Sequence, residues 1–190
     1  MLHFDLETRG VLELKKCGSH SYSMHPHTDV WCLCYYDSDT DTSGTWTPSD
    51  PVPEVFQEPM ETFCAWNAQF ERNIHQNILV PRYGFEPIDV YQWEDTAAWA
   101  RQLGLPSSLA KSAIALGFPV DDQKDRDGTQ LMLRMARPRH FTDRGVPVWW
   151  EDEERLARLI EYCEQDVRVE VNIRRQLRET CRKIPNLSEA

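Results

Sequence analysis

The chain has 190 residues, of which 41% are hydrophobic and 27% charged, as is ordinary for a globular protein. This composition excludes wholesale disorder, a collagen-like repeat and a pure coiled coil, and the length suits a single domain over residues 1–190. The net charge of -10 excludes a strongly basic coat for nucleic acid. The acidity is concentrated in residues 1–66, which hold 11 acids and 3 bases.

The chain shows no signal that would direct it to a membrane. It has no run of 18 apolar residues, and its first seven residues carry acids where a signal peptide needs bases and a long apolar stretch. We therefore expect a cytoplasmic protein without a membrane partner. Its six cysteines should then remain reduced.

The first half of the chain predicts a sheet. Residues 4–8 read as a first strand, and a break at Gly10 follows it. Residues 30–36 form a continuous β-prone run, typical of a strand buried on both faces, and residues 44–47 return as the second strand of a hairpin. Residues 62–66 predict another strand. Asn67 is then expected to cap a helix from Ala68 to about Leu79.

The second half predicts mainly helices. They cover residues 96–103 after an Asp95 cap, 109–116 after Ser107 and Ser108, 129–135, and a long region from 150 to 182. This long helical region could be broken once, near Asp166. The charged segment 121–127 is expected to be a mobile loop. Strands followed by helices indicate an α/β or α+β fold with a mixed sheet covered by helices.

Asp5 and Glu7 form the first of three carboxylate motifs. Alternate residues of a strand face the same side, so the two acids project together. Neighbouring carboxylates repel one another unless a cation or a proton lies between them, and hard oxygen ligands suit Mg²⁺ or Mn²⁺. The alternative is an exposed edge strand with two solvated acids.

The other two motifs lie at the start of one helix and within another. Asn67 and Glu71 fall where a strand turns into a helix, and a plain helix start with a surface Glu explains them as well. Tyr162 and Asp166 are four residues apart and share one helix face, so a phenol and a carboxylate could hold a metal-bound water between them. A buried Tyr beside a solvated Asp is the simpler interpretation.

In combination, the three motifs resemble the DEDD superfamily of 3′–5′ exonucleases. The order is Asp-x-Glu on the first strand, Asn-x-x-Phe-acid after a later strand, and Tyr-x-x-x-Asp near the C-terminus. The Tyr is typical of the DEDDy branch, whereas the His branch would place His at position 161, which is Glu161 here. The chain looks most like the proofreading exonuclease domains of phage family A DNA polymerases, without a polymerase domain after it.

This resemblance implies a ribonuclease H-like α/β fold with a five-stranded mixed sheet, and two divalent cations, Mg²⁺ or Mn²⁺, at its edge. Asp5 would bridge both cations, Glu7 and Asp166 would complete one site, Glu71 would hold its cation directly or through water, and Tyr162 would orient the attacking water. Two such metals stabilise the attacking and leaving oxygens of an in-line displacement. The products would be nucleoside 5′-monophosphates.

One residue departs from the family pattern. The second motif usually ends in Asp, and Glu71 adds a methylene that moves the carboxylate by about one C–C bond. Metal geometry is sensitive to such a shift, so we expect Mn²⁺ to support activity better than Mg²⁺.

Substrate binding is expected from Thr8, Asn67, Phe70, Arg137 and Arg139. The two arginines belong to a basic stretch that holds Arg134, Arg137, Arg139, His140 and Arg144. Such a stretch can contact phosphates, although a solvated Arg-rich turn is nearly as good an explanation. Stacking platforms for single strands could come from Trp66, Phe70, Trp149 and Trp150, but Trp more often lies in a core.

Two other chemistries receive less support from the sequence. His25, His27, Cys32 and Cys34 could be drawn as a zinc site, yet zinc sites usually use Cys-x-x-Cys pairs, and two cysteines pointing the same way on a buried strand suit core packing. Cys163 could be a nucleophile, but it has no nearby His in sequence.

We expect the partner to be nucleic acid, with the 3′ end of single-stranded DNA first and RNA as the alternative. A ribonuclease D-like RNA exonuclease shares the Tyr motif, but that family usually carries an additional helical RNA-binding domain. A catalytically inactive binding module on the same fold is the alternative from another class. We expect a monomer that a separate DNA polymerase could accompany, in the host cytoplasm if the protein is phage-encoded.

Overall fold

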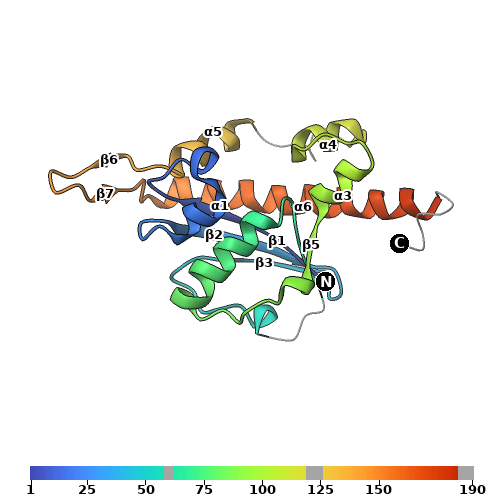
Figure 1. Cartoon of the computed structure of the whole chain (residues 1–190), viewed down its shortest axis with the longest axis horizontal. Coiled ribbons are helices and arrows are strands. Elements are labelled where there is room, and N and C mark those ends of the chain that lie inside the picture. The colour runs from blue at the N-terminus through green and yellow to red at the C-terminus, as the bar shows by residue number, and fades with distance from the viewer. Residues whose placement is uncertain (58–61, 119–125, 184–190) are drawn as a thin grey trace.

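The computed structural model describes residues 1–57, 62–118 and 126–183 and contains a five-stranded mixed sheet in the order β3-β2-β1-β4-β5 (Figure 1). β1 pairs antiparallel with β2 and parallel with β4, while β2–β3 is antiparallel and β4–β5 parallel. The predicted α/β architecture is confirmed and is compatible with a ribonuclease H-like fold. The strands are β1 (Leu2–Arg9), β2 (Asp29–Asp37), β3 (Thr42–Trp46), β4 (Phe63–Ala65) and β5 (Trp93–Asp95).

Helices cover both faces of the sheet, and the longest, α6, runs across one face for most of the length of the molecule (Figure 1). A small hairpin of β6 (His140–Phe141) and β7 (Pro147–Val148) projects at one end. The helices are α1 (Leu14–Met24), α2 (Gln69–Ile74), the π-helical η2 (His75–Tyr83), α3 (Thr96–Gln102), α4 (Leu109–Ala115), α5 (Arg126–Met135) and α6 (Glu153–Lys183), with short 3₁₀ turns η1 (Glu54–Phe56) and η3 (Val90–Gln92).

β1 is the central strand, and its side chains alternate between two different environments. Leu2, Phe4 and Leu6 belong to an apolar cluster with Ile74 and Ile78 from α2 and η2. Burial of each such side chain contributes about 1.5–3 kcal/mol. The intervening residues of β1 point to the opposite face, towards α6. The alternative of an exposed edge strand is therefore wrong.

Helix α6 is continuous from Glu153 to Lys183, so the possible break near Asp166 does not occur. One apolar stripe, containing Leu159, Cys163 and Val167, packs on β2, and a second, containing Val169 and Ile173, packs on α3 and α4. Burial against two layers explains how a helix with so many charges is held in place. Within the described ranges, no helix combines the length and hydropathy that crossing a membrane requires.

The start of the helix after β4 differs from the prediction. Asn67 does not cap it: the N-cap is Ala68, without a side-chain cap hydrogen bond, and Asn67 has a left-handed φ of 66°. The backbone N–H of Asn67 donates instead to Oδ1 of Asp95, at 3.0 Å. Asp95 also caps α3 as predicted, by accepting from the N–H groups of Ala97 and Ala98. One carboxylate therefore fixes two chain turns at the same edge of the sheet.

Several elements had no clear signal in the sequence. Helix α1 contains Gly18 at φ 76°, which interrupts its helical geometry. The apolar residues of α1 also show only a weak helical periodicity. The strands β5, β6 and β7 have only two or three residues each, too few to show a period. The predicted helix at 68–79 also extends to Tyr83, past Pro81. The predicted mobile loop 121–127 lies largely outside the described residues.

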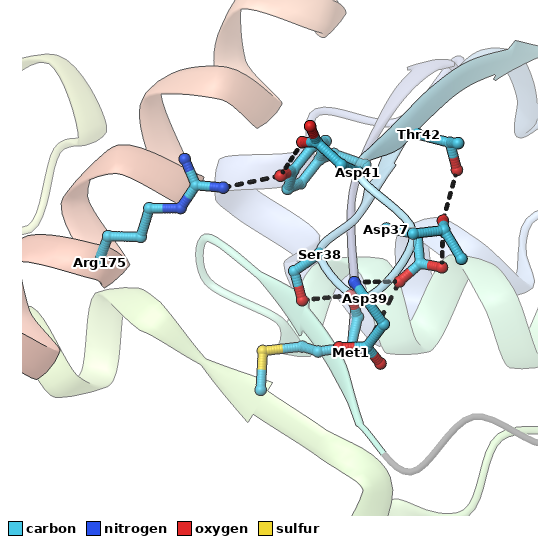
Figure 2. A network of polar contacts seen from close by, with 9 residues as sticks. Met1, Asp37, Ser38, Asp39, Asp41, Thr42 and Arg175 are labelled. Carbon is cyan, nitrogen blue, oxygen red and sulfur yellow. Dashed lines mark hydrogen bonds and ion pairs between the residues drawn. The ribbon is translucent and has the colours of Figure 1, made fainter.

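The turn between β2 and β3 is attached to α6. Arg175 of α6 donates to the hydroxyl of Tyr36 at 2.7 Å, and that hydroxyl donates to Asp41 at 2.7 Å (Figure 2). In the same turn Ser38 donates to the carbonyl of Met1. These contacts fix β2 under α6, which positions the side chains that the two elements share.

Candidate active site

Three carboxylates from two distant segments meet on the α6 side of the sheet. β1 presents Asp5 and Glu7, and α6 brings Asp166 to them, so that one oxygen of each lies within 4.8 Å of the others. Glu7 and Asp166 are buried, and Asp5 is half-buried. The first motif and Asp166 of the third motif therefore form one cluster. Its charge and spacing suit a hard divalent cation.

Glu71 extends this acidic cluster from α2. Its side chain is 3% exposed, and its Oε2 is buried without a hydrogen-bond partner among the described residues. Burial, and after it the negative charge of Asp5, raises the pKa of Glu71 well above its ordinary value. An unsatisfied buried carboxylate oxygen costs about 1–3 kcal/mol or more, a cost that a bound cation would offset.

The acids line a cavity of about 450 Å³ between β1, α1, α2 and α5. Its remaining wall is mainly apolar and carries a few charged side chains at its rim. Of the residues predicted to take part in the site, the ones that line this cavity are Asp5, Glu7, Thr8, Phe70, Glu71, Arg137 and Asp166. Further residues that line the cavity were not predicted from the sequence, and they include Leu12, Leu14, Lys15, Tyr22, Met132 and Leu133.

Tyr162 lies one helical turn before Asp166, as predicted, but α5 covers it. The ring is 2% exposed, its hydroxyl lies 3.3 Å from Oγ1 of Thr129, and Gly128 packs directly on the ring. A Cβ built at Gly128 would come within 2.2 Å of the Tyr162 ring. Tyr162 is not among the described residues that line the acidic cavity.

Asn67 and Arg139 are also not among the described residues that line the cavity. Asn67 is exposed at the turn after β4. Arg139 lies at the base of the β6–β7 hairpin, with its guanidinium 5.3 Å from the centre of the Trp150 ring. Arg134 and Arg155 approach the same ring, at 5.9 and 5.2 Å. Arg134 and Arg139 of the basic stretch thus pack around the Trp150 ring.

The cysteines are all free and do not form the zinc site that could be drawn from the sequence. Cys32 and Cys34 group with Cys163 of α6, whereas His25 and His27 contact each other after α1. Burial raises the pKa of the Cys163 thiol well above its ordinary value, which disfavours a nucleophilic role.

A second polar layer supports the acidic cluster and was not predicted. His3 of β1 donates from Nδ1 to Glu170 of α6 at 2.6 Å, and Thr96 donates to the other oxygen of the same carboxylate. Arg174, one turn further along α6, donates to Glu94 of β5. The signal was present as a four-residue spacing of polar side chains, 162, 166, 170 and 174, within an otherwise apolar helix face.

Nearly the whole chain is similar to part of a known protein. The chain is 28% identical over 191 aligned residues to a DNA polymerase of Bacillus phage SP02. The alignment covers 93% of this chain but only 28% of the polymerase. No model of a known protein family matches the chain. The similarity thus relates nearly the whole chain to one part of a phage DNA polymerase.

Proposed function

We propose that the protein is a metal-dependent 3′–5′ exonuclease that removes nucleotides from the 3′ end of DNA, single-stranded or frayed. The observation that carries this proposal is the convergence of Asp5, Glu7 and Asp166 with Glu71 at one cavity. The resemblance to part of a phage DNA polymerase supports a nucleic-acid enzyme. A proofreading role in DNA replication fits the same similarity.

The residues present fit divalent cations. Asp5, Glu7 and Asp166 would hold them, with Glu71 as a direct or water-mediated ligand, because its buried Oε2 has no hydrogen-bond partner among the described residues. When bound, two Mg²⁺ or Mn²⁺ ions supply charge stabilisation to the attacking and leaving oxygens of an in-line displacement. The all-oxygen donor set suits these ions.

The remaining residues of the cavity suit a nucleotide at a strand end. Arg137 lies at the rim, where its guanidinium can pair with a phosphate in bidentate geometry. Phe70 is half-buried in the wall and offers a ring face on which the terminal base can stack. Thr8 is held by its hydroxyl contact to Tyr22, at 3.2 Å, and shapes the floor of the cavity.

The reaction is hydrolysis of the last phosphodiester bond. The oxygen of water bonds to phosphorus, the bond from phosphorus to the 3′ oxygen breaks, and a proton passes to that 3′ oxygen. The products are a nucleoside 5′-monophosphate and a strand with a new 3′ hydroxyl. Tyr162 would orient the water, which requires the first turn of α5 to move, because Gly128 and Thr129 cover the ring in this conformation.

The test uses a 5′-labelled single-stranded DNA oligonucleotide and its RNA twin, with Mg²⁺, Mn²⁺ or EDTA. We expect a ladder that shortens from the 3′ end, disappears with EDTA and is absent in Asp5→Ala/Asp166→Ala. Glu161→Gln is the matched control, because Glu161 is exposed on α6 next to Tyr162. It removes an acid from the same helix and should leave the rate unchanged.

Each outcome separates the functional alternatives. Faster shortening of DNA supports the proposal, and faster shortening of RNA replaces it with the ribonuclease D-like alternative. If neither strand shortens with either metal, the enzymatic proposal is wrong. Binding of the labelled strand without shortening would then support the inactive module.

A further inference from the structure

We propose that Cys32, Cys34 and Cys163, together with Asp5, form a binding site for a thiophilic divalent cation such as Zn²⁺. We further infer that occupancy of this site inhibits the enzyme. The sulfur atoms of the three cysteines all lie within 4.8 Å of one another. The site is distinct in chemistry from the all-oxygen cluster beside it, with which it shares Asp5.

The pairing of β1 with β2 explains why thiols and carboxylates lie together. In this antiparallel pair Asp5 is opposite Cys34, and Glu7 is opposite Cys32. Residues opposite each other point to the same face of a sheet, here the face covered by α6. Cys163 of α6 is the third cysteine of the group. Its Sγ lies 3.4 Å from the carbonyl oxygen of Asp5 and 3.5 Å from Oδ2 of Asp5.

The spacing of the three sulfurs suits a tetrahedral ion, and Asp5 lies beside Cys163 as the candidate oxygen ligand. Zn–S bonds of about 2.3 Å and Zn–O bonds of about 2.0 Å place sulfurs about 3.8 Å apart and oxygen about 3.5 Å from sulfur. The sulfur separations exceed this by about 1 Å at most, and the distance from Cys163 Sγ to Asp5 Oδ2 already equals 3.5 Å. Rotamer adjustments can make up the difference.

The three thiols are nearly inaccessible, at 0%, 1% and 0% exposure, yet one of them borders a cavity. Cys34 lines a cavity of about 500 Å³ between the β2–β3 hairpin and α6, with Glu164 and Arg168 at its rim. The Arg175–Tyr36 contact of Figure 2 bounds the same cavity. This cavity, which Glu164 also lines, is the approach to the sulfur cluster that we infer for an ion.

Asp5 connects the two sites. A carboxylate oxygen that completes a sulfur-ligated site is withdrawn from the hard cations that Asp5, Glu7 and Asp166 would hold. A thiophilic ion would therefore inhibit without occupying the substrate cavity. This inhibitory part of the inference rests on the proposed function, whereas the binding part rests only on the cysteines and Asp5.

The binding test uses Cd²⁺ as the probe, because cadmium thiolates absorb in the ultraviolet. The protein carries Cys17→Ser and Cys181→Ser, which remove the two partly exposed thiols. We expect absorption that saturates at one molar equivalent of Cd²⁺ and is lost in Cys34→Ala and in Cys163→Ala. The matched control is Cys64→Ala, a buried cysteine of β4 outside the cluster, which should keep the full signal.

The inhibition test measures exonuclease rate in excess Mg²⁺ or Mn²⁺ with added Zn²⁺. We expect a loss of about tenfold or more in the parent protein and in Cys64→Ala, and none in Cys34→Ala. Absence of thiolate absorption in the folded parent protein would overturn the metal site whatever the nuclease does. Absorption without inhibition of an active enzyme would overturn the coupling through Asp5. Absorption in a protein without nuclease activity would support the site and contradict only the proposed function.

Discussion

Nδ1 of His3 donates to the carboxylate of Glu170 at 2.6 Å, although 167 positions separate the two residues. This buried contact sets the register of α6 on β1. Two residues along a strand cover about 6.6 Å, and four residues along a helix cover about 6 Å. The step from His3 to Asp5 therefore matches the step from Glu170 back to Asp166. One polar anchor thus places the next pair of acids side by side.

Breaking this anchor should affect both stability and activity. Glu170→Ala leaves His3 and Thr96 without their buried partner, so the free energy of unfolding should fall by about 3–5 kcal/mol in urea titrations. Glu170→Gln, which keeps a hydrogen-bond acceptor, should lose less. Glu179→Ala, at an exposed position of the same helix, is the control. An unchanged stability of Glu170→Ala would contradict the role of the anchor.

Gly128 should be required for the position of Tyr162. In Gly128→Ala the new methyl group would lie 2.2 Å from the ring, so either α5 or Tyr162 must shift, at about 1–3 kcal/mol of stability. Ala favours a helix over Gly, so helix propensity predicts the opposite sign. We expect a lower free energy of unfolding, measured in urea titrations, in a protein whose circular dichroism spectrum stays native. Gln130→Ala, exposed on the same helix, should leave the stability unchanged, and an equally stable Gly128→Ala would argue against this packing.

Glu71 should make the metal-free protein less stable as the pH rises. Its pKa is raised in the folded state by burial and by Asp5, so between its unfolded and folded pKa values the native state binds more protons than the unfolded state. The contribution of protonated Glu71 to the stability of the folded protein is therefore fully present below the pKa that Glu71 has in the unfolded chain. It is lost as the pH rises through the pKa that Glu71 has in the folded protein. In EDTA, Glu71→Gln should raise the melting temperature at pH 8 and flatten its dependence on pH.

The same variant should bind metal less well. Loss of the Glu71 carboxylate should weaken Mn²⁺ binding about tenfold or more, measured by calorimetry, with a matching loss of rate. Glu161→Gln serves again as the control. If Glu71→Gln were destabilised in EDTA at pH 8 while its metal affinity stayed normal, Glu71 would be a structural residue and not a ligand.

Arg137 should bind a phosphate of the substrate. Arg137→Ala removes a charge-assisted contact at the cavity rim, so KM for the DNA oligonucleotide should rise by about tenfold with a smaller change in kcat. Arg139→Ala should have a weaker effect because its guanidinium lies over Trp150. Arg178→Ala, an exposed position on α6, controls for the change in net charge. Equal KM values for Arg137→Ala and Arg178→Ala would contradict a role of Arg137 in substrate binding.

The main strands, most helices and the three acidic motifs could be predicted from the sequence, because they depend on local alternation, capping and spacing. The β-prone run before Asp37 and the alternating acids Asp5 and Glu7 needed no distant residue to be interpreted. The two-residue strands β6 and β7 are too short to show a period. The start of the helix after Asn67 was not predictable either, because it depends on Asp95, which lies far along the chain.

Which side chains share a site depends on how the strands pair and how α6 and α5 pack on the sheet. The pairing of β1 with β2 puts Cys34 opposite Asp5, and the packing of α6 adds Cys163 and Asp166 to the same face. The cover of α5 over Tyr162 also depends on packing between segments that the sequence leaves independent. Periodicity fixes the direction of a side chain relative to its own element, whereas register and helix packing fix the element relative to the others.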